Sequence, residues 1–294
     1  MKKIGFIGVG IMGKSMVKNL MKAGFELHIY ARTKSKVNDV IEEGAIFHET
    51  IGECVRASEA VITMVGFPQD VEEVYFDEGN ILDSAKEGAY LIDMTTTSPQ
   101  IAEKIYEEGT KRGFHVMDAP VTGGDTGAKA GTLSILVGGE KEDYEACMPL
   151  FEAMGTNINY QGKAGCGQHC KLANQIMIAG TLSGVCEALT YAKEQGLDPE
   201  VFMKSVATGA AGSKQLDTFG PKILKDDYAP GFFMKHFIKD MKLALIEANR
   251  KGLSLDVLSM VLANYEELEQ EGYGDLGTQA LMKFYDEEHR NTEE

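Results

Sequence analysis

The pattern of apolar and polar positions divides the chain into two halves of different character. In the first half, short apolar runs typical of buried strands fall at 3–8, 26–30, 60–65, 89–94, 114–119 and 131–139. Amphipathic helical stretches lie between them, near 12–23, 34–43, 70–77, 99–112 and 141–153. Short strands that alternate with helices indicate a parallel sheet with helices on both faces, which is a doubly wound α/β domain.

The second half contains helical patterns and no strand pattern. The longest helix is predicted over 168–195, with apolar residues at spacings of three and four, and it ends at Gly196 with Pro199 beyond it. Further helices are predicted near 199–208, 213–225, 235–250, 255–271 and 275–286. The pattern therefore predicts a doubly wound α/β domain over 1–163 and an all-helical domain over 164–294, joined by the long helix. The tail DEEHRNTEE is expected to fray.

Composition narrows the class of protein. Of 294 residues, 44% are hydrophobic and 25% charged, which is ordinary for a globular protein. The net charge of −16 argues against a nucleic-acid partner, because phosphate backbones require a basic surface. The same charge repels an anionic substrate at long range, so any anion site must be a local group of donors.

Cysteine usage and apolar run lengths bear on the compartment. The five cysteines are odd in number and lack the spacing of a disulfide framework, so we expect reduced thiols in a cytoplasmic protein. The apolar N-terminal stretch is broken by glycines, and no window reaches the ~18 continuous apolar residues of a membrane span. We therefore expect a protein that is neither exported nor inserted in a membrane.

Three glycines follow the first predicted strand in the pattern Gly-x-Gly-x-x-Gly, and a helix follows them. In this arrangement Gly8 permits the tight turn, Gly10 lets a pyrophosphate approach the backbone, and Gly13 lets the helix pack on the strand. The first helical residues, Ile11 and Met12, offer free N–H groups to the phosphates. The strand–turn–helix context predicts a dinucleotide site, whereas a tight turn without a ligand is the plainer alternative.

The end of the second strand indicates which dinucleotide binds. An NAD site has an acidic residue here against the ribose 2′-hydroxyl. This chain has Ala31, Arg32, Thr33 and Lys34 instead. A guanidinium, a hydroxyl and an ammonium suit a 2′-phosphate, so NADP is the expected cofactor, with NAD used less efficiently.

Four stretches together resemble the β-hydroxyacid dehydrogenase family, which includes 3-hydroxyisobutyrate dehydrogenase, tartronate semialdehyde reductase and glyoxylate or succinic semialdehyde reductases. They are GFIGVGIMGKSMVKNL (5–20), DAPVTGGDTGAKAGTL (118–133), GCGQHCKLANQ (165–175) and FIKDMKLAL (237–245), and the resemblance covers nearly the whole chain. It implies an N-terminal Rossmann domain, a helical C-terminal domain and an active site in the cleft between them.

The second stretch follows a strand, at the sheet edge where open α/β folds bind ligands. Thr122 offers a hydroxyl, and Gly123 and Gly124 expose backbone N–H groups that can hold a carboxylate. The resemblance implies that this loop binds the substrate, with serine the usual residue where Thr122 stands. A glycine loop that only turns the chain is the alternative.

The third stretch begins the long helix. Lys171 and Asn174, with Gln175, share one helical face because they lie three and four residues apart. Lys171 matches the catalytic lysine of the family, and Asn174 matches its asparagine. A lysine whose pKa is lowered by burial suits general acid–base catalysis, whereas an exposed lysine at a helix start is the common structural reading.

The resemblance assigns further contacts. Lys239 is implied to lie by both cofactor and substrate, and Asp240 to help order the site. Thr96 is implied to lie by the nicotinamide, and Met64 and Val65 on the adenosine side. Proline is usual in the family where Gly66 stands. Phe232, Phe233 and His236 lie where members vary with substrate, and the sequence assigns them no role.

A metal site is not expected. Cys166, His169 and Cys170 are close in sequence, but their spacing is not that of a structural zinc site and no second ligand pair follows. These residues are expected to pack at the helix start.

These observations predict an NADPH-dependent reductase of a small anionic semialdehyde acid, which in reverse is a 3-hydroxyacid dehydrogenase, with Lys171 as general acid and base. A decarboxylating dehydrogenase, an imine reductase and a non-catalytic NADP-binding interaction module remain alternatives. The sequence does not distinguish among substrates that differ by a methylene group, worth only ~1–3 kcal/mol in a pocket. Apolar faces on the C-terminal helices predict a homodimer or homotetramer.

Overall fold

The computed structural model describes residues 1–286 and divides the chain into two compact units. The first unit is Met1–Lys171, and the second begins at Leu172. The predicted boundary lies at residues 163 and 164, a few residues before the start of the second unit. The expected fraying of the tail falls on 287–294, outside the described residues.

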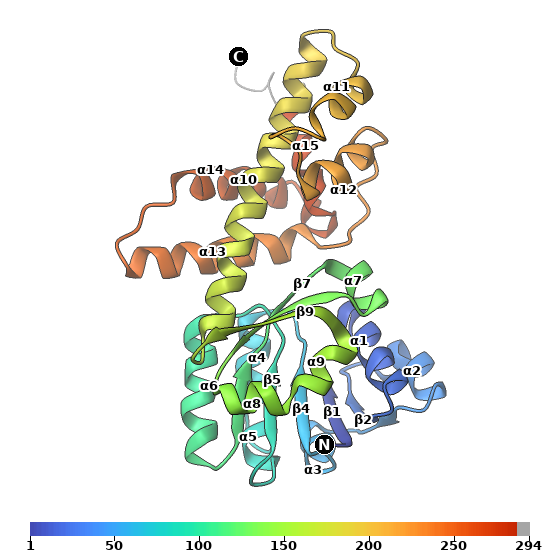
Figure 1. The fold of residues 1–294 in the computed structure, drawn as a ribbon, viewed down its shortest axis with the longest axis vertical. Coiled ribbons are helices and arrows are strands. Elements are labelled where there is room, and N and C mark those ends of the chain that lie inside the picture. The colour runs from blue at the N-terminus through green and yellow to red at the C-terminus, as the bar shows by residue number, and fades with distance from the viewer. Residues whose placement is uncertain (287–294) are drawn as a thin grey trace. The chain divides into compact units, whose positions relative to one another are not determined.

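The first unit is built on one nine-stranded sheet (Figure 1). Its order is β3-β2-β1-β4-β5-β6-β8-β7, with β9 paired to β8. The pairs from β3 through β6 are parallel, β8 is antiparallel to both β6 and β7, and β9 is parallel to β8. The strands are β1 (Lys3–Ile7), β2 (Glu26–Tyr30), β3 (Ile46–Phe47), β4 (Ala60–Thr63), β5 (Tyr90–Asp93), β6 (His115–Asp118), β7 (Val121–Thr122), β8 (Leu133–Gly138) and β9 (Gly155–Gly162).

Helices cover both faces of this sheet. The helical segments are α1 (Ile11–Lys22), η1 (Lys34–Val37), α2 (Asn38–Glu42), α3 (Ile51–Arg56), α4 (Pro68–Phe76), α5 (Ile81–Ser84), α6 (Pro99–Lys111), α7 (Gly124–Ala130), α8 (Lys141–Ala146) and α9 (Met148–Met154). Successive residues of a strand point to opposite faces. Ile62 accordingly joins the core beneath α1 and α9, and Val61 joins the core beneath α3 to α6.

The mostly parallel, doubly wound architecture confirms the prediction, and each of the six predicted strands is present. Three short or polar strands, β3, β7 and β9, were not predicted, nor were helices α3, α5 and α7. The stretch 141–153 forms two helices, since α8 ends at Ala146 and α9 begins at Met148. The antiparallel β8 departs from a purely parallel sheet.

The second unit is helical, as predicted (Figure 1). Helix α10 (Cys166–Glu194) begins in the first unit and is followed by α11 (Pro199–Val206), α12 (Lys214–Ile223), α13 (Met234–Arg250), α14 (Asp256–Gln270), η2 (Tyr273–Asp275), η3 (Thr278–Leu281) and α15 (Met282–Tyr285). Among the described residues after α10, strand pairing is limited to one isolated bridge between Phe233 and Gly277. The hydrophobic core of the second unit includes Leu182, Cys186 and Tyr265.

Helix α10 is also long and apolar enough, by length and composition, to cross a membrane. This differs from the expectation drawn from continuous apolar runs. Core helices of globular proteins pass the same test, and one side of α10 packs into the core of the second unit through Leu172, Ala179, Leu182 and Leu189. The helix therefore has a structural explanation as a core helix.

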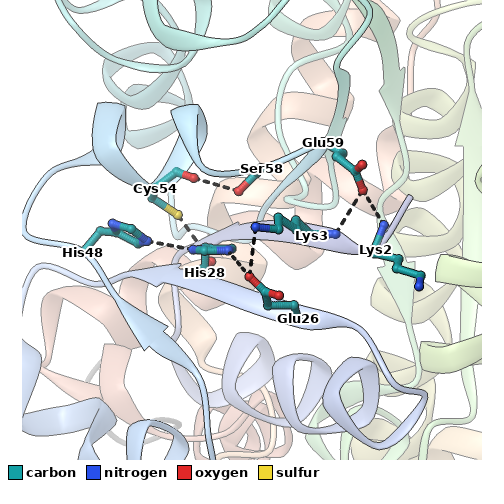
Figure 2. A network of polar contacts seen from close by, with 8 residues as sticks. All are labelled: Lys2, Lys3, Glu26, His28, His48, Cys54, Ser58 and Glu59. Atoms are coloured by element: carbon teal, nitrogen blue, oxygen red, sulfur yellow. Dashed lines mark hydrogen bonds and ion pairs between the residues drawn. The ribbon is translucent and has the colours of Figure 1, made fainter.

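A polar network joins the amino ends of β1 and β2 to α3 and its following turn (Figure 2). The Glu26 carboxylate lies 3.0 Å from Nε2 of His28, and Nδ1 of His28 lies 2.9 Å from Nε2 of His48. The Glu59 carboxylate accepts the backbone N–H groups of Lys2 and Lys3. This network links β1 and β2 to each other, to the residue after β3 and to α3.

Candidate functional site

The turn after β1 has the geometry that the glycine pattern requires. Gly8 has φ +95°, and a Cβ atom there would lie 2.2 Å from the carbonyl oxygen of Met64. A Cβ at Gly13 would lie 2.2 Å from the carbonyl oxygen of Gly8. No side chain caps the first turn of α1 among the described residues, and a Cβ at Gly10 would meet nothing within 4 Å. The uncapped N–H groups and the open approach fit a pyrophosphate.

The residues after β2 lie at the same carboxyl edge. Arg32 and Lys34 are exposed, and each is paired with a carboxylate. The Arg32 guanidinium donates to Asp70, and this hydrogen bond raises the pKa of the guanidinium. Nζ of Lys34 lies 3.1 Å from Oε1 of Glu49. Ala31 is partly buried and Thr33 is exposed, so the group Ala31–Lys34 presents its polar side chains to solvent.

The loops after β4 and β5 are hydrogen-bonded to each other. The Thr95 hydroxyl accepts the backbone N–H of Val65 at 3.0 Å. Met64 and Val65 are partly buried, and so is Thr96. These three predicted cofactor residues therefore occupy neighbouring loops at the carboxyl edge of the sheet, next to the turn after β1.

A buried carboxyl group lies beneath these loops. Oδ1 of Asp93, the last residue of β5, accepts hydrogen bonds from the Thr63 hydroxyl at 2.7 Å and the Thr95 backbone at 3.1 Å. Its Oδ2 has no hydrogen-bond partner among the described residues. Burial raises the pKa of Asp93 from an ordinary 3.8 to about 6. When Asp93 is protonated, its carboxyl group can also donate a hydrogen bond, whereas the ionised carboxylate can only accept hydrogen bonds.

Gln168, in the first turns of α10, binds the loop after β5 from the other side. Its side-chain Nε2 donates to the carbonyl of Thr95 at 2.7 Å, and its Oε1 accepts the N–H of Thr97 at 3.0 Å. The side chain is fully buried. Gln168 therefore satisfies two buried backbone groups that flank Thr96.

Asp118, at the end of β6, fixes the start of α10. Its Oδ1 accepts the N–H of Gly165 at 2.8 Å, and its Oδ2 accepts the N–H of Gln168 at 2.7 Å. Burial raises the pKa of Asp118, while these two hydrogen bonds oppose the shift. A carboxylate at a helix N-terminus binds its free N–H groups and interacts favourably with the helix dipole.

Lys171 lies one turn further along α10 and is almost fully buried, with 7% of its surface exposed. Buried lysines are rare unless they are paired or functional. Because Gln168 and Lys171 are three residues apart on one helix, they share a face. The helix that carries Lys171 is thus bonded at its start to the ends of β5 and β6.

The predicted substrate loop begins in β7, where Thr122 pairs with Ser134 of β8. Gly123 and Gly124 follow with φ +129° and +64°, conformations that favour glycine, and both are exposed. Asp125 stands in the first turn of the following helix. The loop therefore offers a hydroxyl and exposed backbone N–H groups beside one acidic residue.

In the second unit two hydrogen bonds and one ion pair join three predicted residues, Asn174, Lys239 and Asp240, through Gln175. Nδ2 of Asn174 donates to Oε1 of Gln175 at 2.9 Å, and Nε2 of Gln175 donates to Oδ2 of Asp240 at 2.6 Å. Nζ of Lys239 lies 3.0 Å from Oδ1 of Asp240. Asp240 and Gln175 are buried, so α10 and α13 are bound together at this point.

The cysteines form no disulfide, and the described residues contain no group of three or more side chains suited to a metal ion. Cys166 and Cys170 are partly buried and His169 is exposed. Desolvation raises the pKa of Cys54 to about 12, so that thiol stays protonated.

Sequence reasoning did not identify the residues that connect the loops at the carboxyl edge of the sheet with helix α10, or α10 with α13. Asp93 and Asp118 each end a strand directly before a predicted binding loop, which is a signal that could have marked them. Gln175 was placed on the face of Lys171, where its carboxamide was expected to help hold a substrate oxygen, and its bond to Asp240 is a long-range contact that the sequence does not indicate. Gln168 carries no local signal, because its partners lie 71 and 73 residues away.

Two protein families match consecutive parts of the chain. Residues 3–162 match the family described as the NAD binding domain of 6-phosphogluconate dehydrogenase. Residues 165–285 match the family described as NAD-binding of NADP-dependent 3-hydroxyisobutyrate dehydrogenase. Together they account for nearly all of the described chain.

Individual proteins give the same result. The chain is 50% identical over 284 residues to an oxidoreductase of Bacillus subtilis, YkwC, covering 97% of this chain and 99% of that protein. It is 38% identical over 253 residues to 2-hydroxy-3-oxopropionate reductase of Escherichia coli, covering 86% of each. The structure of Mycobacterium tuberculosis 3-hydroxyisobutyrate dehydrogenase with L-serine has a TM-score of 0.88 and 26% identity, covering 96% of this chain and 98% of that one. Two matched families and relatives of this identity and coverage show that the chain is an NAD(P)-binding oxidoreductase of the β-hydroxyacid dehydrogenase family.

Proposed function

We propose that the protein is an NADPH-dependent reductase of a small semialdehyde acid, and in reverse a 3-hydroxyacid dehydrogenase. The observation that carries the proposal is the framework around Gln168 and Asp118. It bonds the helix of Lys171 to the loop of Thr96 and to the end of β6. A candidate proton donor and the candidate nicotinamide loop thus belong to one rigid hydrogen-bonded structure.

The turn after β1 is the proposed pyrophosphate site. Gly8, Gly10 and Gly13 leave room for close approach, and the start of α1 supplies N–H groups. Arg32 and Lys34, with the Thr33 hydroxyl, are proposed to take a 2′-phosphate. When bound, NADPH supplies the hydride, and the protein supplies placement. We expect kcat/KM with NADPH to exceed that with NADH by at least roughly tenfold, or ~1.4 kcal/mol.

The loop Thr122–Gly124 is the proposed carboxylate site. A hydroxyl and backbone N–H groups can bind an anion without adding net positive charge. This suits a protein of net charge −16, in which an anionic substrate gains little from the overall field. Lys239 is proposed to contribute a further cationic contact to the substrate, held in place by Asp240.

Lys171 is proposed to donate the proton. As the carbonyl carbon accepts the hydride, the ammonium of Lys171 protonates the carbonyl oxygen, which leaves a neutral amine and an alcohol. Solvent then returns the proton to the amine. Asn174 is proposed to orient the ammonium or the substrate oxygen, and Gln175 fixes the amide of Asn174 by a hydrogen bond.

The second unit presents several large apolar side chains to solvent: Met177, Ile246, Val257 and Met260. They support the proposal that the protein associates as a homodimer or homotetramer, since large apolar residues on helices are typical of subunit interfaces. Light scattering of the purified protein tests this. Cytoplasmic location stays a prediction.

A substrate screen tests the proposed function. NADPH oxidation is followed with glyoxylate, succinic semialdehyde, tartronate semialdehyde and methylmalonate semialdehyde, and NADP⁺ reduction with the matching hydroxyacids. We expect turnover with at least one aldehyde acid and none with an aldehyde that lacks the carboxylate. NADPH binding without turnover of any of these compounds would favour the non-catalytic alternative.

A further inference from the structure

Arg32 and Asp70 form an ion pair across the carboxyl end of β1. Arg32 follows β2, Asp70 lies in the first turn of α4 after β4, and β1 is the strand between β2 and β4. Neighbouring strands are about 4.8 Å apart, so the two loops are separated by roughly 10 Å at the sheet. The pair therefore spans the edge at which the turn of Gly8 lies.

Asp70 is the fixed partner in this pair. Its Oδ2 accepts the backbone N–H of Phe67 at 2.9 Å, and only 17% of its side chain is exposed. The Arg32 side chain is 66% exposed and donates to Oδ1 of Asp70. A long, exposed arginine can exchange partners at low cost, whereas the anchored carboxylate stays in place.

Two acidic residues of α4 act on Arg32. Glu73, also on α4, acts on the Arg32 guanidinium through its charge, in addition to the hydrogen bond that Arg32 donates to Asp70. An anion that binds Arg32 must replace or share Asp70 and is repelled by its carboxylate. NADH carries no 2′-phosphate, so this competition affects NADPH selectively.

We propose that Asp70 is a cofactor-selectivity residue that competes with the 2′-phosphate for Arg32 and so reduces the preference for NADPH over NADH. The inference rests on the proposed assignment of Arg32 to the 2′-phosphate. The proposal explains why the acidic Asp70 is paired with Arg32, which is one of the residues expected to bind the 2′-phosphate.

The test replaces Asp70 by asparagine in the full chain. Asp70→Asn removes the charge and keeps an oxygen that can accept the Phe67 N–H. The dissociation constants of NADPH and NADH are measured by calorimetry. We expect NADPH to bind about threefold to tenfold more tightly, and NADH to change less than about twofold. Asp70→Ser, which also keeps an acceptor, repeats the measurement if the asparagine variant melts at a lower temperature.

Glu72→Gln is the matched control. Glu72 lies on the same helix, and its carboxylate is 3.4 Å from Lys104 rather than at Arg32. This variant changes the net charge by the same amount, so any general effect of charge on NADPH affinity appears in it as well. We expect its two dissociation constants to match those of the unmutated protein.

Arg32→Ala separates the inference from the assignment on which it rests. Arg32→Ala should weaken NADPH binding, and adding Asp70→Asn to it should then give less than about a twofold gain. If Arg32→Ala leaves NADPH affinity unchanged, the assignment of Arg32 fails and the inference fails with it. If Arg32→Ala weakens NADPH but Asp70→Asn weakens it too, or changes nothing, Asp70 does not compete and the inference alone is overturned.

Discussion

The Asp118 carboxylate accepts the backbone N–H of Gln168 at 2.7 Å, and this bond ties the end of β6 to the first turn of α10. The side chain of the same glutamine then binds both sides of Thr96 in the loop after β5. Two loops of the sheet edge and the helix of Lys171 consequently cannot move independently. We attribute the proposed positioning of Lys171 to this arrangement.

Gln168→Leu should destabilise the protein. The substitution leaves the N–H of Thr97 and the carbonyl of Thr95 buried without a side-chain partner, and each such group costs about 1–3 kcal/mol. We expect the free energy of unfolding in urea to fall by about 2–4 kcal/mol.

Gln69→Leu is the control for that loss, because Gln69 is exposed in the same unit. It should change the free energy of unfolding by less than about 0.5 kcal/mol. Equal stability of the Gln168→Leu and Gln69→Leu proteins would mean that the buried bonds of Gln168 contribute nothing.

Asp93 should make stability depend on pH. Its pKa is about 6 in the folded protein and near 3.8 when unfolded, so the folded state holds the extra proton between these values. The contribution of Asp93 to the free energy of unfolding is therefore largest below pH ~4, and it is lost as the pH rises through ~6. The expected decrease from this group is about 2–3 kcal/mol.

Asp93→Asn isolates that dependence, because the amide keeps an oxygen for Thr63 and Thr95 and cannot ionise. The difference in unfolding free energy between the two proteins is measured from pH 4 to pH 7.5. We expect the unfolding free energy of Asp93→Asn, relative to that of the unmutated protein, to increase as the pH rises. A difference that is constant with pH would contradict the raised pKa.

His48 should have the opposite effect. Desolvation and the neighbouring His28 lower its pKa below the ordinary 6.5. The unfolded state then binds more protons as the pH falls through 6.5, so the protein loses stability in acid. The thermal midpoint should fall less between pH 7 and pH 5 in His48→Gln than in the unmutated protein, and an identical decrease would exclude this contribution.

Thr122→Ala should weaken substrate use and spare the cofactor. A hydrogen bond to a charged group is worth about 1.5–3 kcal/mol, so we expect kcat/KM for the aldehyde acid to fall about tenfold or more. The NADPH dissociation constant should stay within about twofold of the unmutated value. Thr132→Ala, at an exposed threonine after α7, is the control. Unchanged kinetics in Thr122→Ala would leave the loop with a structural role only.

The apolar runs were sufficient to predict the core strands, because each of them is buried on both faces. Strand β9, with the sequence GTNINYQG, was missed since it is largely polar and is held by its backbone pairing with β8. Helix α3 was missed although a signal was present. Thr50 and Glu53 have capping-box spacing, and the Thr50 hydroxyl accepts the N–H of Glu53.

The site could be predicted in part. Glycine spacing and family resemblance identify candidates such as Gly8 and Lys171, because those motifs are local. The ion pair of Arg32 with Asp70 joins residues 38 apart, and no local pattern indicates it. Long-range bonds of this kind depend on the strand order, which follows only from the fold.

The central claim is that Lys171 donates the proton. It is tested most directly by measuring both the turnover and the NADPH affinity of Lys171→Ala in the same preparation. General acid–base catalysis is worth ~10²–10⁴-fold, so we expect kcat to fall at least about a hundredfold. Lys163→Ala, at an exposed lysine just before α10, should keep full activity. The account predicts lost turnover with unchanged melting temperature and NADPH binding. Turnover within about threefold of the unmutated protein would show that another group donates the proton and would contradict it.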